Sequence, residues 1–146
     1  MDNLLILYAP DSPENRSVAS ELAVCFDPGR YAVTAKHAAR SSITDVAAAD
    51  LVVFCLQGSD AGTTVDFSEL TRTFAAANLA GRVAAFASFG DQNASGRLRA
   101  ALSDTDITQF REEAALSQAG SERAQVLKRW AQQLVSFQRA LRDARE

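Results

Sequence analysis

Short continuous apolar runs alternate along this chain with segments in which apolar residues recur at helical spacing. A continuous apolar run bounded by turn residues is typical of a strand buried on both faces of a sheet. Three runs fit this description well, and two weaker ones complete a predicted set of five strands, at residues 3–8, 31–36, 51–56, 83–87 and 106–110.

Helical periodicity fills the intervals between these strands. The first predicted helix carries Val18, Leu22, Cys25 and Phe26 on one face, and it should end at Asp27-Pro28-Gly29, because proline cannot continue a helix and glycine permits the reversal. A short helix is expected from Ser42 to Ala49, capped by Ser41 or Ser42. The remaining helices are marked by apolar stripes at Phe67, Leu70, Phe74 and Ala77, ending near Gly81; at Leu98, Ala101 and Leu102; and at Leu127, Trp130, Leu134, Phe137 and Leu141, within a last helix from Ser121 to about Arg142.

Five strands that alternate with helices predict a parallel sheet with helices on both faces, because each crossover must run over the sheet and return. The predicted fold class is therefore α/β, a doubly wound three-layer sandwich. The length of 146 residues and the lack of an internal repeat or linker predict a single domain over residues 1–146.

The composition limits the expected location and partners of the protein. No apolar run approaches the roughly 18 residues of a membrane span, and Met1-Asp2-Asn3 lacks the basic start of a secretion signal, so we expect a cytoplasmic protein without a membrane partner. The net charge is −3, with thirteen Arg and two Lys scattered along the chain, which argues against nucleic acid as a partner.

Residues that commonly perform catalysis are scarce. Cys25 and Cys55 stand in apolar segments without metal-ligand spacing and are predicted to be buried, reduced thiols. His37, the single histidine, is predicted to be a surface residue. The chain has no nucleophile elbow, Walker loop or dinucleotide fingerprint, so no enzymatic activity is predicted beyond, at most, that of a redox carrier.

Three stretches have a distinctive order and spacing: residues 49–54 (ADLVVF), residues 83–92 (VAAFASFGDQ) and residues 123–134 around Trp130. Together they resemble the short-chain flavodoxins, small electron carriers that hold flavin mononucleotide (FMN), and residues 83–92 are similar to the fourth strand and Gly-Asp loop of that family. This flavodoxin-like resemblance covers nearly the whole chain. It implies a cofactor site in the loops after the first, third and fourth strands, which meet at the switch point of the sheet.

The loop after the first strand departs from the family pattern. Flavodoxins carry Thr/Ser-x-Thr-Gly-x-Thr around the phosphate, whereas this chain has Pro10, Asp11, Ser12, Pro13, Glu14 and Asn15. Only Ser12 keeps its chemistry, although Asn15 can still cap the helix. The prolines lack an N–H donor, and a carboxylate about 5 Å from a phosphate charge costs on the order of 3 kcal/mol. The sequence thus predicts an eroded phosphate site.

The two other loops lack the aromatic residues that would flank a flavin ring. Residues 57–64 contain none, and Ala94 stands where the family typically has Tyr. Phe89 is predicted to pack at the strand end rather than on a flavin. If FMN does bind, the resemblance implies contacts from Ser12, Asn15, Gly58, Ser59, Phe89, Gly90 and Asp91.

Carboxylates gather in or beside these loops instead, and we call them the acidic rim: Asp11, Glu14, Asp60, Asp66 and Asp91. This rim has three interpretations: a solvated surface, a docking site for a basic protein partner, or a divalent cation site. The last would resemble a response-regulator receiver. Receivers place acids at the end of the first strand and Lys after the fifth, where Tyr8-Ala9 and Phe110-Arg111 stand here, so no metal site is predicted.

Two functional hypotheses follow. In the first, the protein is flavodoxin-like with an eroded FMN site, and it works as a binding or regulatory module that presents the acidic rim. In the second, it is an electron-transfer flavodoxin with a divergent phosphate loop, which holds FMN through backbone contacts near Gly58, Gly62 and Gly90.

Overall fold

A parallel sheet forms the centre of the computed structural model, which describes residues 1–57, 66–89, 95–116 and 120–145. The strand order is β2-β1-β3-β4-β5, and β6 pairs with β4 further along the same edge. The strands are β1 (Asp2–Ala9), β2 (Tyr31–His37), β3 (Leu51–Gln57), β4 (Val83–Phe89), β5 (Thr108–Gln109) and β6 (Ala114–Leu116).

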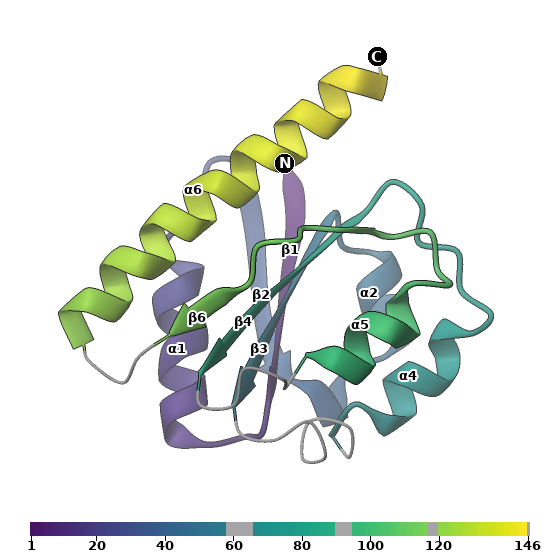
Figure 1. Cartoon of the computed structure of the whole chain (residues 1–146), viewed down its shortest axis with the longest axis horizontal. Helices are drawn as coiled ribbons and strands as arrows, with labels where there is room; N and C mark the ends of the chain where they lie inside the picture. Colours follow the sequence, from purple (N-terminus) through teal and green to yellow (C-terminus); the bar gives the residue numbers. More distant parts are fainter. Residues whose placement is uncertain (58–65, 90–94, 117–119, 146) are drawn as a thin grey trace.

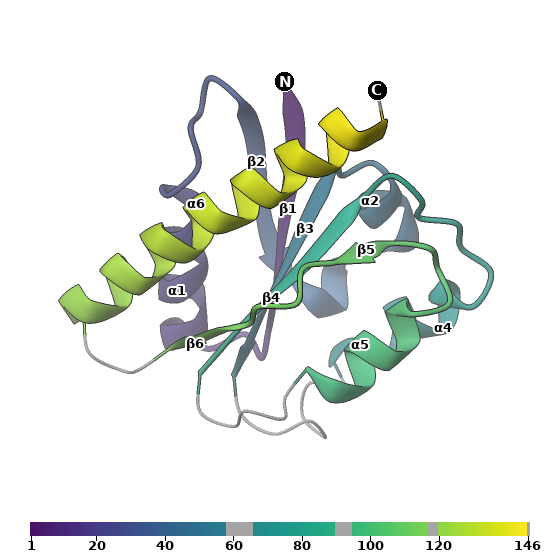
Figure 2. The ribbon, with the colours of Figure 1, turned by 45° about the horizontal axis from the view of Figure 1, so that its top comes forward.

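Helices cover both faces of the sheet (Figures 1 and 2). One face carries α1 (Pro13–Ala23) and the long α6 (Gly120–Arg145), and the other carries α2 (Ile43–Ala47), α4 (Ser68–Phe74) and α5 (Gly96–Leu102). A single turn of 3₁₀ helix, Ala38–Arg40, follows β2. The predicted three-layer α/β architecture is confirmed. None of the described helices is long and apolar enough to cross a membrane.

Each face of the sheet has its own core. On one side, Leu127, Trp130 and Leu134 of α6 pack with Val18 and Leu22 of α1, and all five side chains are buried. On the other side, the helices bury Phe67, Leu70, Phe74, Leu98 and Leu102 against β3 and β4. Because both faces are covered, all seven residues of β4 and the first six of β3 are buried, which explains their continuous apolar runs.

The predicted fifth strand is wrong in detail. Instead of one strand over 106–110, two short strands pair with β4: β5 beside Val83 and Ala84, and β6 beside residues 87–89. The chain between them leaves the ladder where Glu112 and Glu113 interrupt the apolar pattern. The Trp130 indole N–H donates to the Glu112 carbonyl at 2.9 Å, which fixes α6 against this break.

Two helices end well before the predicted residue, and α2 ends two residues early, at Ala47. α1 stops at Ala23, so Cys25 and Phe26 lie in a tight turn in which the N–H groups of both bond three residues back. Phe26 then packs edge-on against Tyr31, with ring centroids 5.3 Å apart. α4 stops at Phe74, which leaves Ala77 outside the helix. Periodicity continued past both ends because the turns also bury apolar side chains.

Candidate functional site

The carboxyl ends of β1, β3 and β4 meet at one edge of the sheet, at the bottom of Figure 1. The order 2-1-3-4-5 reverses between β1 and β3, and in open α/β sheets ligands bind in the crevice beyond that reversal. This edge is therefore the candidate site. Of the residues predicted to lie there, Gly58, Ser59, Asp60, Gly62, Gly90, Asp91 and Ala94 fall outside the described residues.

Ser12 begins helix α1 as its N-cap. Its Oγ accepts a hydrogen bond from the Asn15 N–H at 3.0 Å, and Pro13 occupies the first helical turn, where a missing N–H is tolerated. The Ser12 hydroxyl also donates to Oε1 of Gln57, the last residue of β3, at 2.6 Å. The one hydroxyl proton of Ser12 is thus committed to a protein acceptor.

Asn15 anchors the same turn from inside. Its side chain is fully buried, and its Nδ2 donates to the carbonyl oxygens of Pro10 at 2.9 Å and Cys55 at 3.4 Å. Its Oδ1 is buried and has no hydrogen-bond partner within the described part of the chain. The buried face of Asn15 therefore presents an acceptor, and its two side-chain donors hold the turn against β3.

The two carboxylates of the turn have separate partners. The Glu14 Oε2 accepts from the Gln57 Nε2 at 3.2 Å, so Gln57 links Ser12 to Glu14 in what we call the Gln57 network. Asp11 is exposed and forms an ion pair with Arg16 at 2.6 Å. Its charge is thereby largely offset, which weakens the predicted repulsion of a phosphate by Asp11 but not by Glu14.

His37 is not the surface residue predicted from the sequence. It ends β2 with a side chain only 18% exposed, and its Nε2 lies 3.5 Å from the Asp66 Oδ2. The ring of Tyr8 lies beside it, with centroids 6.0 Å apart. His37 and Asp66 are 29 positions apart in the sequence, and they meet because α4, which begins just after Asp66, packs against the 3₁₀ turn that follows His37.

Phe89 is buried, 3% exposed, in the core beneath α6. This agrees with the packing role predicted for it. Next to it, Ser88 donates to Oε2 of Glu113 at 2.7 Å, and Ser95 donates to Oε1 of the same carboxylate at 2.5 Å. Arg99 of α5 lies 3.5 Å from it. Glu113 thus joins the two chain segments that flank residues 90–94, a role that no local sequence pattern indicated.

The two thiols differ in burial. Cys55 lies inside β3 with no exposed surface, and this burial raises its pKa to about 12. Cys25 is only half-buried in the turn after α1, which corrects the prediction that both thiols are buried. Burial first, and the nearby Glu21 carboxylate second, raise the Cys25 pKa. Neither thiol has the lowered pKa of a reactive nucleophile.

Within the described ranges, no group of three or more His, Cys, Asp or Glu side chains is arranged to hold a metal ion. The acidic-rim residues placed by the structure each contact a different neighbour: Asp11 meets Arg16, Glu14 meets Gln57, and Asp66 meets His37. The carboxylates are therefore spread along the edge rather than gathered around one point.

No protein-family model and no curated protein sequence matches the chain. Solved structures do resemble it. A short-chain flavodoxin associated with a non-canonical PDU bacterial microcompartment superposes with a TM-score of 0.79 at 19% identity, over 94% of this chain and 99% of that one.

Two further flavodoxins are similar over most of both chains. The Streptococcus pneumoniae protein gives a TM-score of 0.76 at 17% identity, over 92% of this chain and 99% of that one. The Fusobacterium nucleatum flavodoxin, described as bound to flavin mononucleotide, gives 0.74 at 8% identity, over 94% and 99%. Sheet order, length and these superpositions agree, and the chain has the flavodoxin fold.

Proposed function

We propose that this protein is a flavodoxin-like binding or regulatory module whose candidate site does not hold the phosphate of FMN. The observation that carries the proposal is the Gln57 network. The Ser12 hydroxyl and the Asn15 N–H, two donors at the start of α1 that a phosphate could use, already bond within the protein.

Admitting a phosphate would cost free energy at each of these contacts. The bonds Ser12–Gln57, Asn15–Ser12 and Gln57–Glu14 would have to open or rearrange. At roughly 1 kcal/mol for a neutral bond and 1.5–3 kcal/mol for one to a charged group, the three together amount to about 4 kcal/mol. Every 1.4 kcal/mol is a tenfold change in affinity, so this rearrangement alone weakens binding by about a thousandfold.

The remaining chemistry of the turn also disfavours a dianion. Pro13 supplies no N–H at the first helical position, and Glu14 brings a negative charge to the next. The unpartnered Oδ1 of Asn15 is an acceptor, and a doubly ionised phosphate has no proton to give it. These groups suit a turn closed by the protein itself.

In this proposal the acidic rim serves as the interaction surface for a basic protein partner. Asp11, Glu14 and Asp66 contribute described side chains, although the ion pair with Arg16 offsets part of the charge of Asp11. Steered association of this kind weakens with added salt. Binding of a lysine-rich peptide tests this surface, with the double variant Glu14→Gln and Asp66→Asn removing two of its charges. Affinity that is unchanged in the variant would contradict the proposal.

The two free thiols fit the reducing cytoplasm that we propose as the location of the protein.

One observation favours the second candidate, an FMN-binding electron carrier with a divergent phosphate loop. The similar Fusobacterium nucleatum structure is described as bound to flavin mononucleotide, and it covers 94% of this chain. In that case the flavin would be held chiefly outside the turn at Ser12, with no contribution from the Gln57 network.

The absorbance of the purified protein and a titration with FMN separate the two candidates. We expect colourless protein and no saturable FMN binding below about 1 mM, which corresponds to only about 4 kcal/mol of binding free energy. A matched variant, Pro13→Gly with Glu14→Ala, restores an N–H and removes a charge, and it should bind FMN at least as tightly as the parent. Protein that purifies yellow, or a micromolar dissociation constant for the parent chain, would overturn the proposal.

A further inference from the structure

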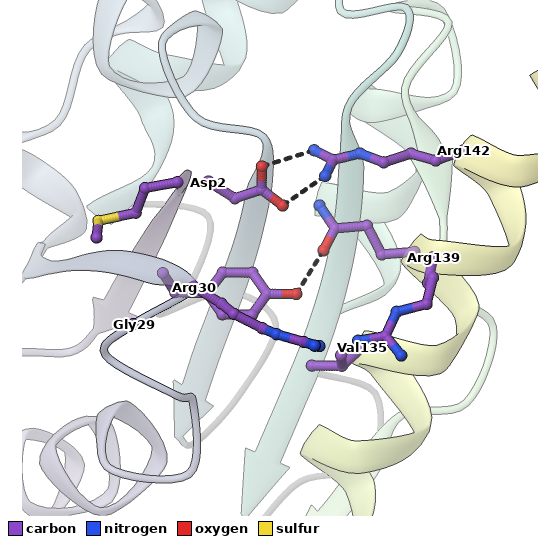
Figure 3. Close-up of a pocket in the computed structure, with 9 residues that line it drawn as sticks. Asp2, Gly29, Arg30, Val135, Arg139 and Arg142 are labelled. Atoms are coloured by element: carbon purple, nitrogen blue, oxygen red, sulfur yellow. Dashed lines mark hydrogen bonds and ion pairs between the residues drawn. The ribbon is translucent and has the colours of Figure 1, made fainter. Parts of the chain in front are cut away.

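A cavity of about 350 Å³ lies at the amino edge of the sheet, opposite the candidate site. The beginnings of β1 and β2 form one wall, and the last third of α6 forms the other (Figure 3). Three arginines line it: Arg30 before β2, and Arg139 and Arg142 on α6. Asp2 is the one carboxylate among these lining residues, so the surface of the cavity is cationic although the net charge of the chain is −3.

One of the three arginines is already paired. Arg142 contacts both carboxylate oxygens of Asp2, at 2.7 and 2.9 Å, and lies 3.9 Å from the Asp50 carboxylate. Arg30 and Arg139 have no ion pair or hydrogen bond with any side chain that the structure describes. In Figure 3 both extend toward Val135 on the wall of the cavity. Two guanidinium groups are thus available to one ligand.

The interior of the cavity supplies a neutral donor. Gln138 is only 4% exposed, and its Oε1 accepts the hydroxyl proton of Tyr31 at 2.7 Å. Since this bond uses the oxygen, the Nε2 of Gln138 is left as a donor, and it is bonded to no described residue. Gln138 is one of the residues that line the cavity, so this donor lies at the cavity wall. Burial is the main cause that raises the pKa of Tyr31, which keeps its hydroxyl protonated.

A second cavity of about 290 Å³ adjoins the first. The two share Arg30, Tyr31 and Val135, and the second adds the apolar side chains of Phe26 and Ala131. Its one carboxylate, Asp27, accepts the Gly29 N–H at 2.9 Å. We call the two adjoining cavities the groove. One end is cationic beside Arg139, and the other has the apolar side chains of Phe26 and Ala131 together with the polar ones of Gln132 and Ser136.

We propose that this groove binds a small organic anion, with its phosphate or carboxylate group between Arg30 and Arg139 and its apolar body toward Phe26. Guanidinium groups match the planar, two-oxygen geometry of such anions, and the Gln138 Nε2 can donate to a further oxygen. This site is separate from the turn at Ser12, so the binding of an anion here does not depend on whether FMN binds there.

Titration of isotope-labelled full-length protein, followed by NMR, tests the site directly. The probes are phenyl phosphate, benzoate and inorganic phosphate in low-salt buffer. We expect saturable shifts in the amides of residues 29–31 and 135–142, with phenyl phosphate or benzoate binding at least tenfold more tightly than inorganic phosphate. Their ratio distinguishes a phosphate ligand from a carboxylate one.

Arg30→Ala and Arg139→Ala should each weaken binding about tenfold, a loss of roughly 1.4 kcal/mol. Both side chains are exposed, so both variants should fold. The matched control is Arg111→Ala, which removes an exposed arginine that does not line the groove. Three results would each overturn the proposal: equal affinity in all three variants, shifts confined to other parts of the chain, or no saturation at about 10 mM probe. A dissociation constant above about 10 mM corresponds to a binding free energy under about 3 kcal/mol.

Discussion

Cys55 shows at the scale of one residue how complete burial changes chemistry. Its thiol has no exposed surface, and desolvation raises its pKa from 9.0 to about 12. Deprotonation would place an unpaired charge inside the sheet, so the folded protein keeps the proton that the unfolded chain releases near pH 9.

The free energy of unfolding should therefore fall as pH rises above 9. Below pH 9 the thiol is protonated in both states and has no effect. Between pH 9 and 12 the unfolded state binds fewer protons, and stability drops by up to about 1.4 kcal/mol per pH unit. Urea denaturation from pH 8 to 10.5 should show that the free energy of unfolding declines less in Cys55→Ala than in the parent. Cys25→Ala removes the half-buried thiol, and it should retain most of the decline seen in the parent. Parallel declines in the parent and Cys55→Ala would contradict the role of burial.

At the scale of an element, α2 is a five-residue helix held by its first turn. Ser42 and Asp45 form a reciprocal capping box, and Lys36 of β2 adds a bond to the Asp45 carboxylate at 3.2 Å. Partial burial acts to raise the pKa of Asp45, but the bonds from the Ser42 N–H and Lys36 outweigh it and lower the pKa.

The capping box should lose its effect in acid. Because the folded pKa of Asp45 lies below the unfolded value, its contribution is present above about pH 4 and is lost as pH falls through the folded pKa. Asp45→Asn should cost about 1 kcal/mol at pH 7 and close to nothing at pH 2–3, measured by urea denaturation. A cost that is the same at both pH values would show that the charge does not matter.

Glu113 links two segments that border the candidate site, the end of β4 and the start of α5. Its carboxylate accepts from Ser88 at the end of β4 and from Ser95 at the start of α5. Glu113→Ala leaves both hydroxyls without this acceptor and should cost about 2 kcal/mol. Faster amide exchange at Ser88 and Ser95 would accompany the loss. Glu112→Ala removes the exposed neighbouring carboxylate and keeps the carbonyl that Trp130 uses, so it should leave both measurements nearly unchanged.

At the scale of the whole molecule, α6 links parts of the chain that are far apart in the sequence. At its start, Arg123 forms a two-pronged ion pair with Glu21 of α1, at 2.8 and 3.0 Å, and near its end Arg142 pairs with Asp2. Between these ends, Leu127, Trp130 and Leu134 are buried. One helix thus covers a face of the sheet and forms a wall of the groove at the amino edge.

The fold was largely predictable from the sequence, because burial on both faces leaves a continuous apolar run wherever β1, β3 or β4 passes. The cap at Ser42, one of two serines proposed for it, and the apolar stripe around Trp130 were also predictable, since caps and helical faces are local patterns. Gln57 and Glu14 are different. They stand 43 positions apart, and only the adjacency of β1 and β3 brings them together. Glu113, His37 and Gln138 were missed for the same reason, because each acquires its role from a distant partner.

A comparison of FMN with riboflavin, which lacks the phosphate, shows whether the turn at Ser12 is closed to a phosphate. Both can be titrated into the protein under the same conditions and followed by flavin fluorescence. We expect FMN to bind no more tightly than riboflavin, whether both bind weakly or not at all. If FMN binds 100-fold more tightly, the turn contributes about 2.7 kcal/mol to holding the phosphate, and the proposal of a closed turn is wrong.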